Sequence, residues 1–422
     1  MTAIGKAIYF DPKAIGQSSH GFSTLVDTAL LFLTLMVSCD MLVHLGPSQS
    51  AAWLVCYTVA LLRVMMLWPE YGAMLLRNKV ILAYPFVCLI SVLWSKAPTE
   101  TLVSSIQLTM TFVIASYLAW RYSLSAITRA VFVVLAFTMA LSVLHWATSV
   151  FPWQVYSRAG GLIGVFSQKN MLGQRALFCA VIILAIWLMP RREASRNMKT
   201  CASVAMLLTL LALVLSQSMT SVLLLPALMG LMALICIRRI PPLVSTSVAA
   251  MTMLTIALGP VVLAVAGVEP LGILLASVGK DATLTGRTEL WHVAQQVRAD
   301  FPLLGVGYGA FWAAPEFANE RLMTQHAGAV TSVSFHNFIL EILVASGLPG
   351  AVAMLALLAT AALRLMRLVL RTGSVAASCN LVLLFGIIVT SLLGPSLYRG
   401  HEFMILLLVM FTASAREDAL RL

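Results

Sequence analysis

Long runs of apolar residues, most of them separated by short polar connections, dominate this sequence. A run of about 20 apolar residues can cross the hydrocarbon core of a bilayer as a helix, which satisfies its own backbone hydrogen bonds. The pattern predicts an all-α, polytopic membrane protein with about twelve transmembrane helices. We place these helices near residues 24–45, 50–68, 80–94, 100–120, 128–150, 171–189, 200–216, 220–237, 243–266, 348–366, 375–395 and 402–414.

The composition supports a lipid environment. Of the 422 residues, 60% are hydrophobic and 10% are charged, whereas about a quarter of the residues in a soluble domain are charged. No boundary between soluble domains interrupts the apolar runs, so we expect residues 1–422 to form a single membrane domain.

The net charge of +11 would suit a nucleic-acid-binding protein, but in a membrane protein the positions of the charges matter more than their sum. Cytoplasmic loops are enriched in Lys and Arg, and clusters such as Arg77/Lys79, Arg191/Arg192 and Arg238/Arg239 fall in alternate loops. The alternation predicts that both termini are cytoplasmic. Because it also accounts for the positive charge, we expect membrane lipid as a partner and no nucleic acid. Arg63, near the cytoplasmic end of its helix, is interpreted as a side chain that snorkels to the interface.

Two segments depart from this simple threading. Residues 152–174 place Arg158, Lys169 and several glycines next to the membrane, which suggests a re-entrant or broken helix. The stretch 267–334, between the ninth and tenth predicted helices, is too long for a plain connection. By the alternation of loops it is periplasmic, and we expect residues 267–347 to form a helical subdomain there.

The first helix expected in this periplasmic loop covers residues 285–302. Leu290, Ala294, Val297 and Phe301 recur at helical spacing and form one apolar face. Thr285 is a suitable N-cap, which would place Arg287 in the first turn, where free backbone N–H groups favour an anion.

A second helix is expected to begin at Ser334, as N-cap, and to break at Gly347. It would carry His336 and Asn337 in its first turn and place Asn337 and Glu341 on one face. Because a helix N-terminus disfavours the charged imidazolium, His336 is a candidate general base.

Cations on the outer side or inside the membrane are the other candidates for chemistry, because such positions are costly for a charge. Arg175 has two interpretations: it pairs with a carboxylate or snorkels, or it helps to form a cationic pocket for a phosphate or diphosphate. For Arg298, Arg321 and Lys280, solvated surface charge is the simpler interpretation. No cluster of histidines and carboxylates has the spacing of a zinc site, so we expect neither a metal nor another cofactor.

Several short motifs, taken in order, resemble the O-antigen ligase and Wzy-type polymerase family of bacterial envelope glycan assembly. The matching stretches are residues 164–173 (GVFSQKNMLG), 215–221 (LSQSMTS), 285–291 (TGRTELW), 301–309 (FPLLGVGYG) and 336–341 (HNFILE), with Gly347 and Gly350. Their wording is closer to exopolysaccharide polymerases of the ExoQ type than to lipid A-core ligases.

This resemblance implies a metal-independent, inverting glycosyltransferase of the bacterial inner membrane, with its active site facing the periplasm. The donor would be an undecaprenyl-diphosphate-linked glycan, and the acceptor a glycan or lipid A-core. His336 and Arg287 would be the catalytic pair. The substrate-binding candidates are Arg158, Lys169, Asn170, Arg175, Asn337, Glu341 and Arg399.

Two alternatives stay open at this point. The ligase branch often has an arginine where this sequence has Met219, so Lys169 or Arg175 would have to replace part of the diphosphate clamp in a ligase. A membrane transporter is the alternative from another class of protein. Against it, we find no strong similarity in hydropathy between the two halves of the chain.

Overall fold

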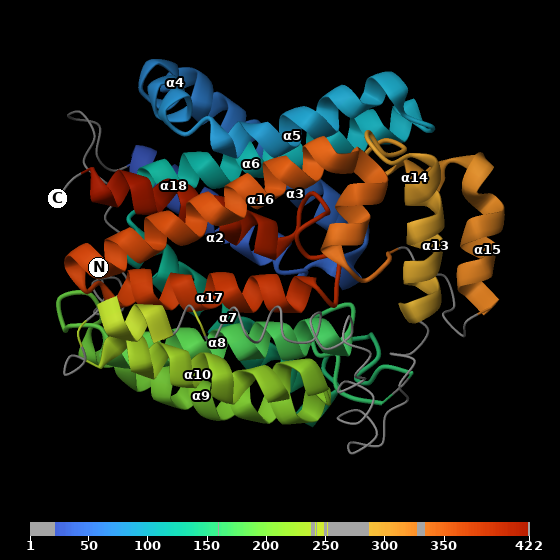
Figure 1. Cartoon of the computed structure of the whole chain (residues 1–422). Helices are drawn as coiled ribbons and strands as arrows, with labels where there is room; N and C mark the ends of the chain where they lie inside the picture. The colour runs from blue at the N-terminus through green and yellow to red at the C-terminus, as the bar shows by residue number, and fades with distance from the viewer. Residues whose placement is uncertain are drawn as a thin grey trace.

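The structure, a computed structural model, describes residues 22–158, 160–237, 241, 243–248, 251, 287–326 and 334–420. The regular elements in these residues are helices, with one isolated β-bridge between Tyr156 and Leu162. Figure 1 shows the long helices lying side by side in one bundle. Residues 243–248 are also helical. The other helices of four or more residues are α2 (Phe22–Ser38), α3 (Pro47–Met66), α4 (Trp68–Arg77), α5 (Val80–Ile90), η2 (Ser91–Trp94), α6 (Pro98–Arg121), α7 (Leu124–Thr148), α8 (Lys169–Leu188), α9 (Arg196–Ser216), α10 (Met219–Cys236), α13 (Arg287–Asp300), α14 (Ala310–Ala313), α15 (Ala318–His326), α16 (Phe338–Thr372), α17 (Val375–Ser391) and α18 (Phe403–Ala419).

Seven of the described helices are long and apolar enough to cross a membrane. The count is up to eight if α4 and the segment Val80–Trp94, which meet at a bend of 91°, form one span. Each predicted span outside residues 243–266 coincides with a helix, and the span predicted at 243–266 lies mostly outside the described residues. The chain is therefore an all-helical, multi-pass membrane protein.

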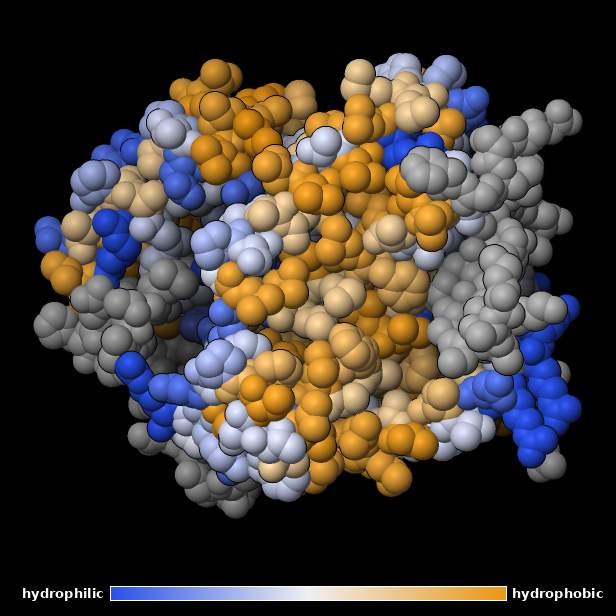
Figure 2. All heavy atoms as spheres, turned by 180° about the vertical axis from the view of Figure 1, so that it is seen from behind, coloured by the Kyte–Doolittle hydropathy of each residue, from blue (hydrophilic) through white to orange (hydrophobic). Residues whose placement is uncertain are grey.

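The outer surface of the bundle is apolar where lipid would contact it. Large side chains of α3 and α9 are exposed, including Met65 (72%) and Leu207 (71%). Figure 2 shows hydrophobic residues gathered in a broad band, with hydrophilic residues towards the two ends. A band of this kind matches the hydrocarbon layer of a bilayer.

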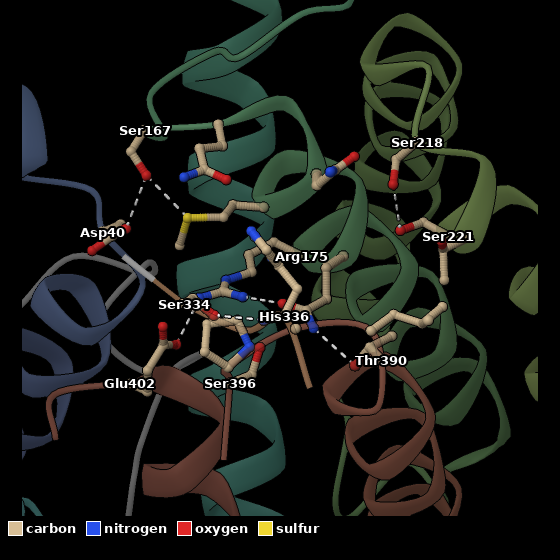
Figure 3. A pocket seen from close by; sticks show the side chains of 18 of the residues that line it. Asp40, Ser167, Arg175, Ser218, Ser221, Ser334, His336, Thr390, Ser396 and Glu402 are labelled. Atoms are coloured by element: carbon tan, nitrogen blue, oxygen red, sulfur yellow. Dashed lines mark hydrogen bonds and ion pairs between the residues drawn. The ribbon is translucent and has the colours of Figure 1, made fainter. Parts of the chain in front are cut away.

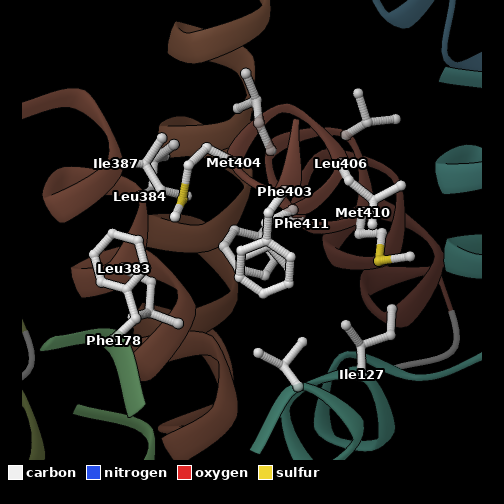
Figure 4. Packing of buried hydrophobic residues seen from close by; sticks show 14 of the residues in the cluster. Ile127, Phe178, Leu383, Leu384, Ile387, Phe403, Met404, Leu406, Met410 and Phe411 are labelled. Carbon is white, nitrogen blue, oxygen red and sulfur yellow. The ribbon is translucent and has the colours of Figure 1, made fainter. Parts of the chain in front are cut away.

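The last helix, α18, lies at the centre of the bundle. It contacts α6, α16, α7, α17, α2 and α5, and Phe403, Met404 and Phe411 are almost completely buried. Figure 4 shows these side chains packed near Leu383 of α17 and Phe178 of α8. Helices α8, α17 and α18 are thus held against a common apolar core.

At one end of the bundle, α13 and α14 pack with the start of α16 around a separate small core, and α15 lies beside α13 (Figure 1). Leu290, Ala294 and Val297 of α13 are buried there, as their helical spacing predicted, together with Phe311 and Phe335. The predicted N-cap Thr285 lies outside the described residues.

Helix α16 is kinked at Gly347, where the sequence predicted a break. Gly347 has φ 62° and ψ −155°, and a Cβ there would lie 2.1 Å from the carbonyl oxygen of Leu303. The segment 303–307 docks into the kink, because Leu348 N donates to Leu303 O and Val306 N donates to Val344 O. The glycine-rich stretch 305–309 therefore belongs to the packed structure. Its glycines allow its backbone to approach the backbone of α16 closely.

The prediction of a re-entrant or broken helix in residues 152–174 is wrong before Lys169, where α8 begins. The preceding chain is irregular and packs on the bundle end, with Leu162 N donating to Leu215 O. Gly161 has φ 84°, and a Cβ there would lie 2.5 Å from Ser216 O. The described residues of 152–168 thus pack closely against the turn between α9 and α10 and do not form a helix of their own.

Candidate functional site

A polar cavity of about 430 Å³ opens at the end of the bundle near α13. Its walls come from chain segments that are far apart in the sequence: the turn after α2, the start of α8, the start of α10, the segment before α16 and the connection from α17 to α18. Four residues predicted from the sequence line it: Asn170, Arg175, His336 and Arg399. Figure 3 shows Arg175 and His336 converging on this space from different elements.

Arg175, in the second turn of α8, is the most deeply buried cation of the site, with 1% of its surface exposed. Its Nη1 donates to Gln174, and its Nη2 lies 3.9 Å from a carboxylate oxygen of Glu402. Within the described residues, Nε and Nη2 have no hydrogen-bond partner. A buried guanidinium with unused donors is costly, so this arrangement is suited to an anion that enters the cavity.

Glu402 is a site residue that the sequence reasoning missed. It lies just before α18, and its side chain, 21% exposed, borders the cavity beside Arg175. Burial raises the pKa of Glu402 to about 7, although the neighbouring Arg175 opposes this shift. The signal available in the sequence was a carboxylate at the edge of an apolar run, next to the candidate Arg399.

His336 lies in the cavity wall, but the predicted helix start at Ser334 is wrong. Helix α16 begins at Phe338, and Asn337 is the N-cap, because its side chain accepts hydrogen bonds from Ile339 N and Leu340 N. His336 has φ 52° and lies immediately before this cap, with its backbone N–H donating to Ser334 Oγ. Asn and Ser are comparable as N-caps, and the left-handed turn at His336 decides in favour of Asn337.

Two predicted binding residues support this turn from behind. A carboxylate oxygen of Glu341 accepts a hydrogen bond from Phe335 N at 2.6 Å, and the other accepts from Trp312 Nε1. Neither Asn337 nor Glu341 lines the cavity. In this structure both residues fix the backbone that carries His336.

Arg399 is positioned by the glycine-rich stretch 305–309. Tyr308 Oη donates to Tyr398 O at 2.7 Å, Gly400 N donates to Tyr308 Oη, and Gly309 N donates to Tyr398 Oη. The same stretch that docks into the kink of α16 thus holds the loop that carries Arg399 and Glu402.

The wall facing these cations carries uncharged polar groups and one carboxylate. Asp40 accepts hydrogen bonds from Ser167 Oγ and Gln49 Nε2, both at 3.3 Å. Ser218 and Ser221, at the start of α10, are joined by a hydrogen bond of 3.1 Å. Hydroxyl and carboxylate groups of this kind can hydrogen-bond the hydroxyl groups of a sugar.

Two further predicted residues, Arg158 and Lys169, do not line the cavity, and the prediction for Arg287 stays untested. Arg158 is exposed, and Lys169 lies at the first position of α8, but neither lines the cavity. Arg287 begins α13, and its side chain lies outside the described part of the chain. Among the described residues, no group of three or more His, Cys, Asp or Glu side chains could hold a metal ion.

Comparison with known proteins agrees with the resemblance found in the motifs. Residues 204–355 match a family described as O-Antigen ligase. The chain is also 31% identical over 294 residues to the exopolysaccharide production protein ExoQ of Rhizobium meliloti (strain 1021), an alignment that covers 67% of this chain and 63% of that protein. The chain thus spans slightly less than two thirds of the length of this relative. The resemblance to the O-antigen ligase family is confirmed.

Proposed function

We propose that this protein is a glycosyltransferase of the bacterial inner membrane. It moves glycan from an undecaprenyl-diphosphate-linked donor to an acceptor sugar at the periplasmic face, in the polymerisation of a surface polysaccharide. The observation that carries the proposal is the buried Arg175, which has unused donors beside His336 in one cavity. The name of the relative, an exopolysaccharide production protein, supports polymerisation.

The proposed topology has about twelve spans, cytoplasmic termini and a periplasmic subdomain at residues 267–347. Helices α2 and α18 meet at Tyr122. Its Oη forms a hydrogen bond with Thr28 of α2, and its carbonyl oxygen accepts a hydrogen bond from Ser414 of α18. An even number of membrane spans returns the chain to the side on which α2 begins, which accounts for this contact. The cavity lies at the opposite end, beside the helices of the proposed periplasmic subdomain (Figure 1).

In the proposed reaction, the diphosphate lies against Arg175 and Arg399, with Arg287 as a further candidate from α13. These cations stabilise the charge that develops on the leaving group. His336 takes the proton of the acceptor hydroxyl, whose oxygen attacks the anomeric carbon as the bond to the diphosphate breaks. Undecaprenyl diphosphate leaves with the electron pair, and attack from the opposite face inverts the anomeric centre.

The second candidate is an O-antigen ligase that joins the lipid-linked glycan to lipid A-core. The family description of residues 204–355 favours it. The same cavity chemistry serves both reactions, because the donor and its leaving group are the same. The acceptor that yields product with the purified protein distinguishes the two.

The His336→Ala variant tests the proposal in purified, lipid-embedded protein supplied with an undecaprenyl-diphosphate-linked glycan. Loss of a positioned base should lower the rate by about 10²–10⁴-fold, with little change in donor binding. The limb of the pH–rate profile that rises near neutrality should disappear. The matched control is His292→Ala, since His292 is exposed on α13 and contacts Gln296.

Weakened donor binding with an unchanged pH limb would instead make His336 a ligand of the donor. Absence of any new glycosidic linkage with the wild-type protein, under conditions where the donor binds, would overturn the enzyme assignment and favour a transporter.

A further inference from the structure

The side chain of Glu402 lies where an anion bound to Arg175 would lie. We propose that Glu402 holds the place at Arg175 that a phosphate oxygen of the donor takes, so that donor binding is coupled to proton uptake by Glu402. This inference rests on the proposed function and adds to it a residue that determines how donor affinity depends on pH.

The geometry of the pair is that of a loose, replaceable contact. The separation of 3.9 Å between Arg175 Nη2 and Glu402 Oε2 is too long for a hydrogen bond. Arg175 itself cannot withdraw, because it is 1% exposed and its Cζ lies 5.3 Å from the centre of the Phe403 ring. An incoming phosphate oxygen that bonds Nη2 directly would therefore compete with the Glu402 carboxylate for one fixed cation.

The charged or titratable groups that line the cavity with Glu402 come from four of its five wall segments, since the start of α10 contributes only hydroxyl groups. Arg175 faces it from α8, Asp40 from the turn after α2, Arg399 from its own loop and His336 from the segment before α16. With both carboxylates ionised and His336 neutral, the two arginines and the two carboxylates sum to zero. Protonation of Glu402 gives the cavity one net positive charge. This charge stabilises a bound diphosphate, whereas it is unfavourable in the empty cavity.

The raised pKa of Glu402, about 7, agrees with this account, because the proton is then available near neutral pH. Asp40 contributes to the raised pKa, and Arg175 and Arg399 oppose it. A bound diphosphate would add negative charge beside Glu402 and retain the proton more strongly. Above about pH 7, each pH unit should weaken donor binding by up to about tenfold.

The experiment measures binding of undecaprenyl diphosphate to the full-length protein in nanodiscs of uncharged lipid, between pH 6 and pH 8.5. Wild-type affinity should fall by about 30-fold over this range, as expected for one linked proton with a pKa near 7. In Glu402→Gln this fall should disappear, so that binding at pH 8.5 is about 30-fold tighter than in the wild type. Any change that arises from ionisation of the diphosphate itself is common to both proteins and cancels in their comparison.

The matched control is Glu316→Gln, because Glu316 pairs with Lys96 at 3.5 Å and does not line the cavity. This variant should keep the wild-type curve. If Glu402→Gln does not fold, Asp40→Asn serves as a second measurement. Removing the charge of Asp40 should lower the pKa of Glu402 and move the onset of weakening to lower pH.

A Glu402→Gln protein that keeps the wild-type pH dependence overturns this inference and leaves the diphosphate site in place. So does an Asp40→Asn curve whose onset stays at the wild-type pH. Failure of the wild type to bind undecaprenyl diphosphate at any pH overturns the proposed function instead, so the two failures are distinguishable.

Discussion

Two groups of charged side chains, one around Asp27 and one around Arg175, lie at opposite ends of the bundle and differ in how well their hydrogen bonds are satisfied. At the end where α2 begins, Asp27 is completely buried. It accepts hydrogen bonds from Arg63 Nε at 2.9 Å, Arg121 Nε at 2.8 Å and Tyr117 Oη at 2.7 Å. One carboxylate thus ties together α2, α3 and α6.

At the other end, Arg175 has one carboxylate neighbour at 3.9 Å and, within the described residues, two nitrogens without a hydrogen-bond partner. In the first group Asp27 accepts hydrogen bonds from both arginines and joins helices, whereas in the second Arg175 keeps unused donors and faces a cavity. Burial alone therefore does not mark a functional cation. We expect a functional cation to be one whose donors the protein places in a cavity and leaves unused, as at Arg175.

The largest expected effect that separates the two groups is on stability, at Asp27. The change Asp27→Asn leaves two buried arginines without their carboxylate, and we expect it to lower the free energy of unfolding by about 3–5 kcal/mol. Thermal unfolding in detergent measures the loss. Transfer activity per folded molecule should stay at the wild-type value, and a fall in that activity without a fall in stability would place Asp27 in the reaction.

The reverse pattern is expected at Arg175. Arg175→Gln should reduce transfer by about 10²–10³-fold, because it removes cationic donors from the developing diphosphate charge. Its thermal stability should stay near or above that of the wild type, since an incompletely satisfied buried charge is lost. Arg298→Gln on the exposed face of α13 is the control. Destabilisation of the Arg175 variant as large as that of the Asp27 variant would contradict the distinction between the two groups.

The smallest effect concerns the pH dependence of stability. Because the pKa of Glu402 is raised from 4.5 to about 7 by burial, the folded protein holds this proton more tightly than the unfolded chain does. Protonated Glu402 contributes at most about 3 kcal/mol to the free energy of unfolding. This contribution is complete below about pH 4.5 and is lost as the pH rises to about 7. The contribution is measured by comparing the free energy of unfolding of the wild type with that of Glu402→Gln between pH 5 and pH 8. If the two free energies change in parallel with pH, Glu402 does not titrate in this range.

Much of the fold follows from the sequence, because apolar length decides which segments can cross lipid. The helices that coincide with predicted spans, the apolar face of α13 and the kink at Gly347 were all readable from local pattern. The bend between α4 and α5 and the irregular chain before Lys169 were not, since both depend on contacts between segments.

The site was only partly readable for the same reason. Arg175 and His336 stood out by charge and motif, and the structure brings them to one cavity. The prediction that Arg63 snorkels was wrong, because its partner Asp27 belongs to a different helix. Asp40 and Glu402 were missed. Glu402 had only its place at the edge of an apolar run near Arg399 as a signal, and the neighbours of both carboxylates come from distant parts of the chain.

The central place of α18 has a consequence for how the protein is made. Among the described helices it is the last to leave the ribosome, yet it is the one against which α6, α16 and α17 pack. A nascent chain that has inserted every helix up to α17 still lacks both its middle and the residues Arg399 and Glu402. Assembly of the cavity therefore waits for α18, and a nascent chain that stops before α18 lacks two residues of the proposed diphosphate site, so it would not sequester a scarce lipid carrier there.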